Sequence, residues 1–254
     1  MEYSQVTGTH PGPPFTPLNI GSLWYMLVAH LYVGVPIVIV YIALAPYAIS
    51  LGFPSLVVLL LCEVTIMPLL ILGHLYSKGY RRNGRANLNG VVRWGNSIGV
   101  KRFVLLLLGC VLLTIALYAP AYLAGTVLRD TLFNWLPDWY FNPGFEQAAP
   151  RLLLFTVVLA IISDGIVAPI LEELYFRGYL LPNMRALGWL APLVNAALFT
   201  LYHFWQPHNY LGIFAVSLVI SFAVWKTGSL RLGIAIHCSL NLLSSIGLLG
   251  YLSF

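Results

Sequence analysis

The feature that most constrains this chain is a series of apolar runs, each about 20 residues long, separated by shorter polar segments. An α-helix of that length spans the hydrocarbon core of a bilayer, which is roughly 30 Å thick. Only 8% of the 254 residues are charged, whereas a soluble domain averages about 25%. The sequence therefore predicts an all-α fold, a polytopic transmembrane helical bundle.

The apolar runs predict about seven spans, with room for an eighth. The fourth run is too long for one straight crossing, because about 30 residues make a helix of roughly 45 Å. Pro169 lies inside this run, and we expect a kinked or re-entrant helix there. The seven predicted spans cover approximately residues 23–45, 54–76, 103–125, 152–181, 187–205, 211–225 and 232–252.

The basic residues predict the orientation of the bundle. The loop at 77–102 carries seven Lys or Arg residues and no acidic residue. Short loops of this kind stay on the cytoplasmic side, so this loop and the N-terminus are predicted to be cytoplasmic in an inner or cytoplasmic membrane. Most of the basic excess behind the net charge of +5 lies in this loop, where Lys and Arg side chains would contact anionic lipid headgroups. The positive charge therefore does not indicate a nucleic-acid partner.

Three charged residues lie within six positions of the fourth apolar run, at 172–177. A charge at membrane depth costs roughly 2.5–3.5 kcal/mol on insertion scales and marks a candidate functional site. On a helix, Glu173 and Arg177 share one face, whereas Glu172 points elsewhere. We expect Arg177 to hold Glu173 in an ion pair, which leaves Glu172 free to act as a general base. A purely structural salt bridge is the alternative.

Two further polar pairs lie in later runs. Phe199 and His203 are four residues apart, as are His237 and Asn241. The second pair presents two hydrogen-bond donors on one helix face, as a developing oxyanion requires. Both pairs would also suit polar contacts between packed helices.

Two other acidic residues lie within apolar runs. Glu63 falls in the second run, and Asp164 precedes the expected distortion at Pro169. We interpret both as structural residues that hydrogen-bond neighbouring helices.

The motifs EELYFR, FTLYH and HCSLN, in this order, resemble the pattern EExxxR, FxxxH and HxxxN/D. This is the pattern of the CAAX-protease and bacteriocin-processing family (CPBP or Abi) of intramembrane glutamic endopeptidases. The resemblance covers roughly residues 160–245. It implies that Glu172 activates the attacking water and His203 orients that water, while His237 and Asn241 stabilise the oxyanion. Structural support of the site would come from Glu173, Arg177 and Phe199.

The resemblance also implies that the site needs no cofactor, because the family is generally viewed as metal-free. A zinc site remains an alternative, since two imidazoles and a carboxylate are a known donor set. That site would use Glu172, His203 and His237.

We predict three segments: an N-terminal tail at 1–22, accessory transmembrane helices at 23–150, and a catalytic core at 151–254. The implied partners are the lipid bilayer and a membrane protein or a lipidated or leader peptide as substrate. Two other functions stay open on the same scaffold. One is a non-catalytic binding or immunity protein, and the other is a proton-coupled transporter.

Overall fold

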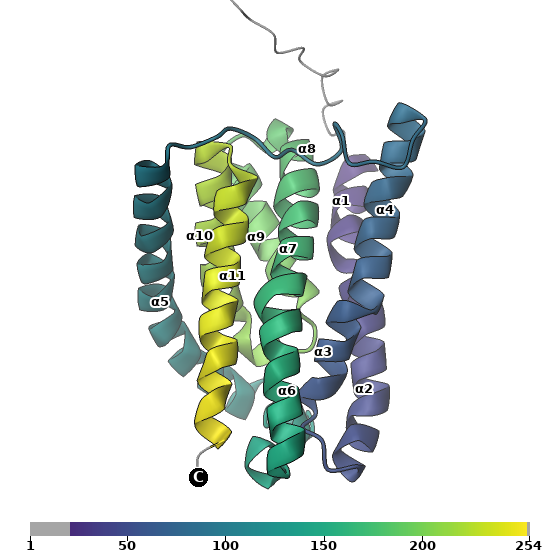
Figure 1. Ribbon diagram of the computed structural model, residues 1–254, viewed down its shortest axis with the longest axis vertical. Coiled ribbons are helices and arrows are strands. Elements are labelled where there is room, and N and C mark those ends of the chain that lie inside the picture. Colours follow the sequence, from purple (N-terminus) through teal and green to yellow (C-terminus); the bar gives the residue numbers. More distant parts are fainter. Residues whose placement is uncertain (1–20, 253–254) are drawn as a thin grey trace, which may run out of the picture.

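The computed structural model describes residues 21–252 as a bundle of helices (Figure 1). Within this part of the chain, the only β-structure is a single bridge between Gly95 and Ser229. The predicted all-α class is confirmed. The predicted tail at 1–22 lies outside the described residues, except for its last two residues, which begin α1.

The main helices are joined by short turns, two π-helical segments and one longer loop between α4 and α5. In order they are α1 (Gly21–Leu31), α2 (Gly34–Ser50), α3 (Leu56–Val64), α4 (Ile66–Asn83), α5 (Val100–Thr131), α6 (Pro150–Ile162), α7 (Ala168–Glu172), α8 (Leu181–Asn183), α9 (Leu190–Tyr202), α10 (Tyr210–Thr227) and α11 (Leu230–Gly247).

Six helical segments of the described residues are long and apolar enough to cross a membrane. The predicted span at 187–205 is instead a 13-residue apolar helix, α9. At 1.5 Å per residue, α9 is about 20 Å long, which is shorter than the hydrocarbon core. The six segments are Trp24–Ser50, Leu56–Asn83, Val100–Thr131, Pro150–Asn183, Pro207–Thr227 and Leu230–Leu252.

The fourth span is distorted where Pro169 was expected to distort it. Two π-helical segments, η3 (Ser163–Val167) and η4 (Glu173–Leu180), flank α7. A proline cannot donate to the carbonyl four residues earlier, and a π-helical turn relieves the clash with that carbonyl. The helix stays continuous from Pro150 to Asn183 and is wider at the two π-helical segments. It does not turn back as a re-entrant segment would.

The distorted span lies at the centre of the bundle (Figure 1). In that view α5 lies at one side and α1 to α4 lie at the other, with α9 behind. The central helix contacts α1, α3 and α4 on one side and α11 on another, and α10 packs against both α5 and α9. The helices at 23–150 therefore flank those at 151–254 on two sides (Figure 1).

The loop between α4 and α5 closes one end of this core. The Arg93 amide donates to the Gly178 carbonyl at 2.9 Å, and the Leu230 amide donates to the Trp94 carbonyl at 3.2 Å. Gly95 has φ +72°, and an added Cβ would collide with the Gly228 carbonyl. The loop is thus hydrogen-bonded to the central span and to the turn between α10 and α11.

We predict that Gly34→Ala destabilises the bundle. An added Cβ would collide with the Tyr202 carbonyl oxygen and lie 2.9 Å from the Tyr202 ring, so α2 would have to move away from the end of α9. Overpacking of this kind costs about 1–3 kcal/mol. A lower thermal unfolding temperature in detergent would show the effect.

The matched control is Gly73→Ala, at a helical glycine with no heavy atom within 4 Å of the added Cβ. Alanine should be neutral or stabilising there, because it favours the helix. Equal unfolding temperatures for the two variants would contradict the close packing of α2 on α9.

Candidate active site

The sequence-predicted site residues come from three parts of the core. Two of the three parts are helix ends, where the chain changes its helical geometry, and the third is the middle of α11. The π-helix η4 and the end of α7 carry Glu172, Glu173 and Arg177; the end of α9 carries Phe199 and His203; α11 carries His237 and Asn241.

Arg177 is fully buried, with 0% of its surface exposed, as is Glu173. Its Nη1 donates to Glu173 Oε1 at 2.8 Å, and its Nη2 donates to the Ser217 hydroxyl at 2.6 Å. Its Nε faces the Ser221 hydroxyl at 3.3 Å, and its Cζ lies 4.2 Å from the centre of the Phe199 ring. The guanidinium is thus held by a carboxylate, two hydroxyls and an aromatic face.

A second layer of polar residues supports this arginine. The Ser221 hydroxyl donates to Asn195 Oδ1 at 3.0 Å, and Asn195 Nδ2 lies 3.2 Å from His30 Nε2. Asn195, His30 and both serines are fully buried. Sequence reasoning missed them, although Ser217 and Ser221, four residues apart in an apolar span, are a signal for polar contacts between helices.

His237 lies between the two glutamates. Its Nδ1 is 3.0 Å from Glu173 Oε1, and its Nε2 is 3.7 Å from Glu172 Oε2. A carboxylate can only accept, so Nδ1 carries the hydrogen in this arrangement. Glu173 therefore binds Arg177 and also fixes the orientation of the imidazole that faces Glu172.

His203 follows the last residue of α9, where the chain leaves the helix. Its Nδ1 lies 2.8 Å from the Phe199 carbonyl oxygen, and its ring packs on the Phe199 ring with 4.7 Å between centroids. The opposite nitrogen, Nε2, is thereby directed away from α9. The centroid of the His237 ring is 6.0 Å from that of Phe199, so both imidazoles border one phenyl ring.

Asn241 hydrogen-bonds to Asp164, whereas the sequence predicted a donor beside His237. Its Nδ2 donates to the Asp164 carbonyl at 2.9 Å and lies 3.3 Å from Asp164 Oδ1. The Ser245 hydroxyl donates to the other carboxylate oxygen at 3.0 Å. Asp164 thus joins α11 to η3, in agreement with its structural interpretation. In this arrangement Asn241 is not a free donor beside His237.

Two buried groups near Glu172 were not assigned to the site from sequence. Glu63 interacts electrostatically with Glu172 and Asp164, and its Oε2 has no hydrogen-bond partner among the described residues. Tyr202 is also fully buried, and its hydroxyl interacts with the Glu172 carboxyl group. The accessory helix α3 therefore adds a carboxyl group to the surroundings of Glu172.

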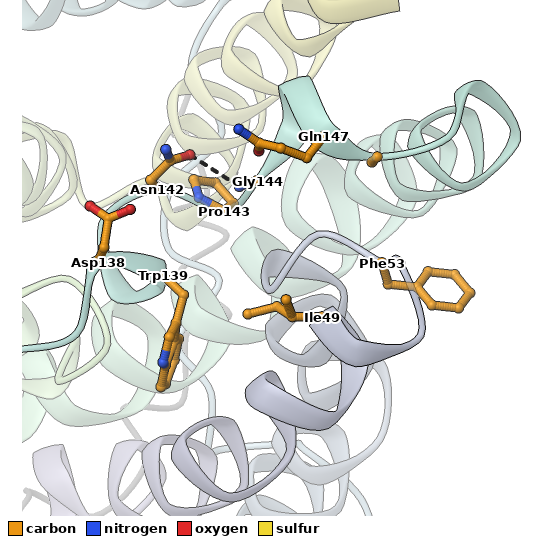
Figure 2. A pocket seen from close by; sticks show the side chains of 10 residues that line it. Ile49, Phe53, Asp138, Trp139, Asn142, Pro143, Gly144 and Gln147 are labelled. Atoms are coloured by element: carbon orange, nitrogen blue, oxygen red, sulfur yellow. Dashed lines mark hydrogen bonds between the residues drawn. The ribbon is translucent and has the colours of Figure 1, made fainter.

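A surface cavity at the end of α2 and in front of the start of α6 does not coincide with these residues. It is a cavity of about 320 Å³, and Figure 2 shows Trp139, Asn142 and Gln147 among its side chains. None of the sequence-predicted site residues lines it. Across the described residues, no group of three His, Cys, Asp or Glu side chains is arranged to hold a metal ion.

Comparison with known proteins identifies the segment that carries the site. Residues 152–243 match the family model described as type II CAAX prenyl endopeptidase Rce1-like. The match begins in α6 and ends in α11, and it includes every sequence-predicted site residue. No curated protein and no solved structure matches the chain.

We predict that Arg177→Ala strongly destabilises the protein. The substitution leaves Glu173 as a buried charge without its cation, which costs about 3–5 kcal/mol in buried pairs. Thermal unfolding in detergent measures the loss. Arg129→Ala is the control, because the Arg129–Asp130 pair is exposed and should contribute little. Unfolding of Arg177→Ala at the wild-type temperature would contradict the central role of the pair.

Proposed function

Since residues 152–243 belong to the Rce1-like type II CAAX prenyl endopeptidase family, we propose that this integral membrane protein is a protease in which Glu172 activates the attacking water. The family supports a membrane protease over the binding protein and the transporter considered from sequence. The glutamate mechanism and the roles of the individual residues are the proposal.

One observation carries this assignment of roles: the two adjacent glutamates have different partners. Glu173 binds Arg177 at 2.8 Å and His237 at 3.0 Å. Glu172 has no cation as close, because its nearest ion-pair partner is His237 Nε2 at 3.7 Å. A carboxylate neutralised by a guanidinium is a poor base, so Glu172 is the group that can accept a proton.

The proposed reaction is a water-mediated hydrolysis. Glu172 takes a proton from a water molecule that His203 orients, and the water oxygen attacks the peptide carbonyl carbon. His237, held by Glu173 through Nδ1, donates to the oxyanion from Nε2 when both of its ring nitrogens carry a hydrogen. Asn241 would also donate to the oxyanion if its Nδ2 left Asp164. The intermediate then collapses, the C–N bond breaks, and Glu172 passes its proton to the leaving amine.

The substrate proposed is a peptide bond of a membrane protein or of a lipidated or leader peptide. The site lies among the membrane-spanning helices, where His203 follows the last residue of α9. A peptide anchored in the bilayer reaches such a depth, whereas a soluble peptide would have to leave water. A prenylated C-terminal peptide is the first candidate on the basis of the matched family.

The orientation proposed follows from the basic loop. Short loops rich in Lys and Arg face the cytoplasm, which places the end of the bundle with the 84–99 loop there. In Figure 1 α11 ends at the opposite end of the bundle from this loop. The proposal therefore puts the C-terminal end of α11 outside the cytoplasm.

We predict that Glu172→Gln lowers the cleavage rate at least a hundredfold while the protein still folds. Glutamine keeps the shape of the side chain but cannot accept the proton, and general-base catalysis contributes about 10²–10⁴-fold. His203→Ala should act in the same direction. The assay follows cleavage of a fluorogenic prenylated peptide in proteoliposomes and compares membrane-protein termini in wild-type and Glu172→Gln cells.

The control for this series is Glu146→Gln, an exposed glutamate in the loop before α6. It should keep the wild-type rate. Full activity of both Glu172→Gln and His203→Ala on an identified substrate would overturn the proposed roles.

We predict that chelators leave the activity unchanged. The buried Arg177 guanidinium stands beside the site and opposes binding of a divalent cation by like-charge repulsion. The measurement is the cleavage rate before and after dialysis against a chelator. Inactivation that added Zn²⁺ reverses would instead assign Glu172, His203 and His237 as zinc ligands.

A further inference from the structure

A second cavity, of about 360 Å³, lies at the other end of the bundle, outside the candidate active site. It forms where the last turns of α4, the 84–99 loop and the end of the catalytic span meet. It is lined by Lys78, Arg81, Arg82, Gly90, Val91, Tyr179 and Asn183. We propose that this cavity binds the phosphate group of an anionic lipid.

The charge of the cavity has one sign. Three of its lining residues are basic and none is acidic. Their spacing of three and four residues places Lys78, Arg81 and Arg82 on one face of α4. The sequence has no Asp or Glu between Glu63 and Asp130, so the loop supplies no carboxylate to neutralise Lys78 and Arg81. An anion is the ligand that this chemistry favours.

The wall of the cavity is built by specific contacts. Asn83 Nδ2 donates to Asn87 Oδ1 at 2.8 Å and to the Asn89 carbonyl at 2.9 Å. Gly90 has φ +68°, and an added Cβ would lie 3.1 Å from Arg82 Nε. Val91 is buried and anchors the loop in the core. The loop is therefore fixed against α4.

The position of the cavity at the ends of two membrane spans favours a lipid over a soluble anion. Its lining residues lie at the ends of two spans, Leu56–Asn83 and Pro150–Asn183. Lipid phosphates lie at this boundary between hydrocarbon and water. Basic pockets between transmembrane helices at this level bind anionic headgroups, and the bilayer supplies them at high local concentration.

Aromatic side chains complete the site. The Tyr25 and Tyr179 hydroxyls are 3.1 Å apart, and Lys78 Nζ lies 5.3 Å from the centre of the Tyr25 ring. Tyrosines are enriched at this interface because one end of the ring is apolar and the other end is polar. Tyr179 belongs to the same π-helix as Arg177, so a bound lipid would contact the helix that carries the active site.

The test is lipid retention by the full-length protein in detergent, measured by native mass spectrometry during titration with phosphatidylglycerol or phosphatidylcholine. Wild type should retain phosphatidylglycerol preferentially. The double variant Lys78→Gln, Arg81→Gln should bind it roughly 30-fold more weakly, at about fivefold for each basic residue near a membrane surface. The double variant Lys101→Gln, Arg102→Gln removes the same charge from exposed positions outside the cavity and should bind nearly as wild type.

Equal retention of the two lipids, or equal loss in the two double variants, would overturn the proposal. Arg81→Glu, a single change at an exposed position, provides a second readout if the first double variant does not fold. Thermal protection by inorganic phosphate or by a peptide carboxylate, without protection by phosphatidylglycerol, would assign the cavity to a soluble anion and overturn the lipid assignment. None of these readouts depends on proteolytic activity.

Discussion

A buried guanidinium organises the core of this protein. Arg177 cannot lose its charge and has no exposed surface, so the chain must surround it with acceptors. Glu173 supplies the counterion and α10 supplies two hydroxyls. Because Glu173 also binds His237, the same interaction that makes the arginine tolerable in a membrane orients an imidazole toward Glu172. Stability and the proposed chemistry thus depend on one cluster of contacts.

Irregular helices bring the remaining groups to this cluster. The π-helical segments on either side of α7 let Pro169 remain inside a continuous span, and α9 ends after only 13 residues. His203 directly follows α9 and packs beside Phe199, whose ring also borders His237. Departures from regular geometry are frequent at functional sites in helices.

Contacts within the candidate site could be predicted from sequence only where the information was local. The Glu173–Arg177 pair follows from the i, i+4 spacing of one helix, and it forms in the structure. The spacing of His237 and Asn241 is just as local, but it could not reveal that Asn241 faces Asp164 from another segment. Nor could it reveal that Glu63, far away in the sequence, adds a carboxyl group near Glu172.

The sequence by itself determined the all-α membrane class, the distorted fourth span and the motifs that mark the candidate site. Apolar run length, proline chemistry and helical spacing are properties of neighbouring residues, so they can be read without the fold. The tertiary structure decided the length of α9, the chain of contacts from His30 through Asn195 and Ser221 to Arg177, and the closure of the basic loop over the core. Those features depend on which helices pack together, and helix packing is determined by residues that are far apart in the sequence.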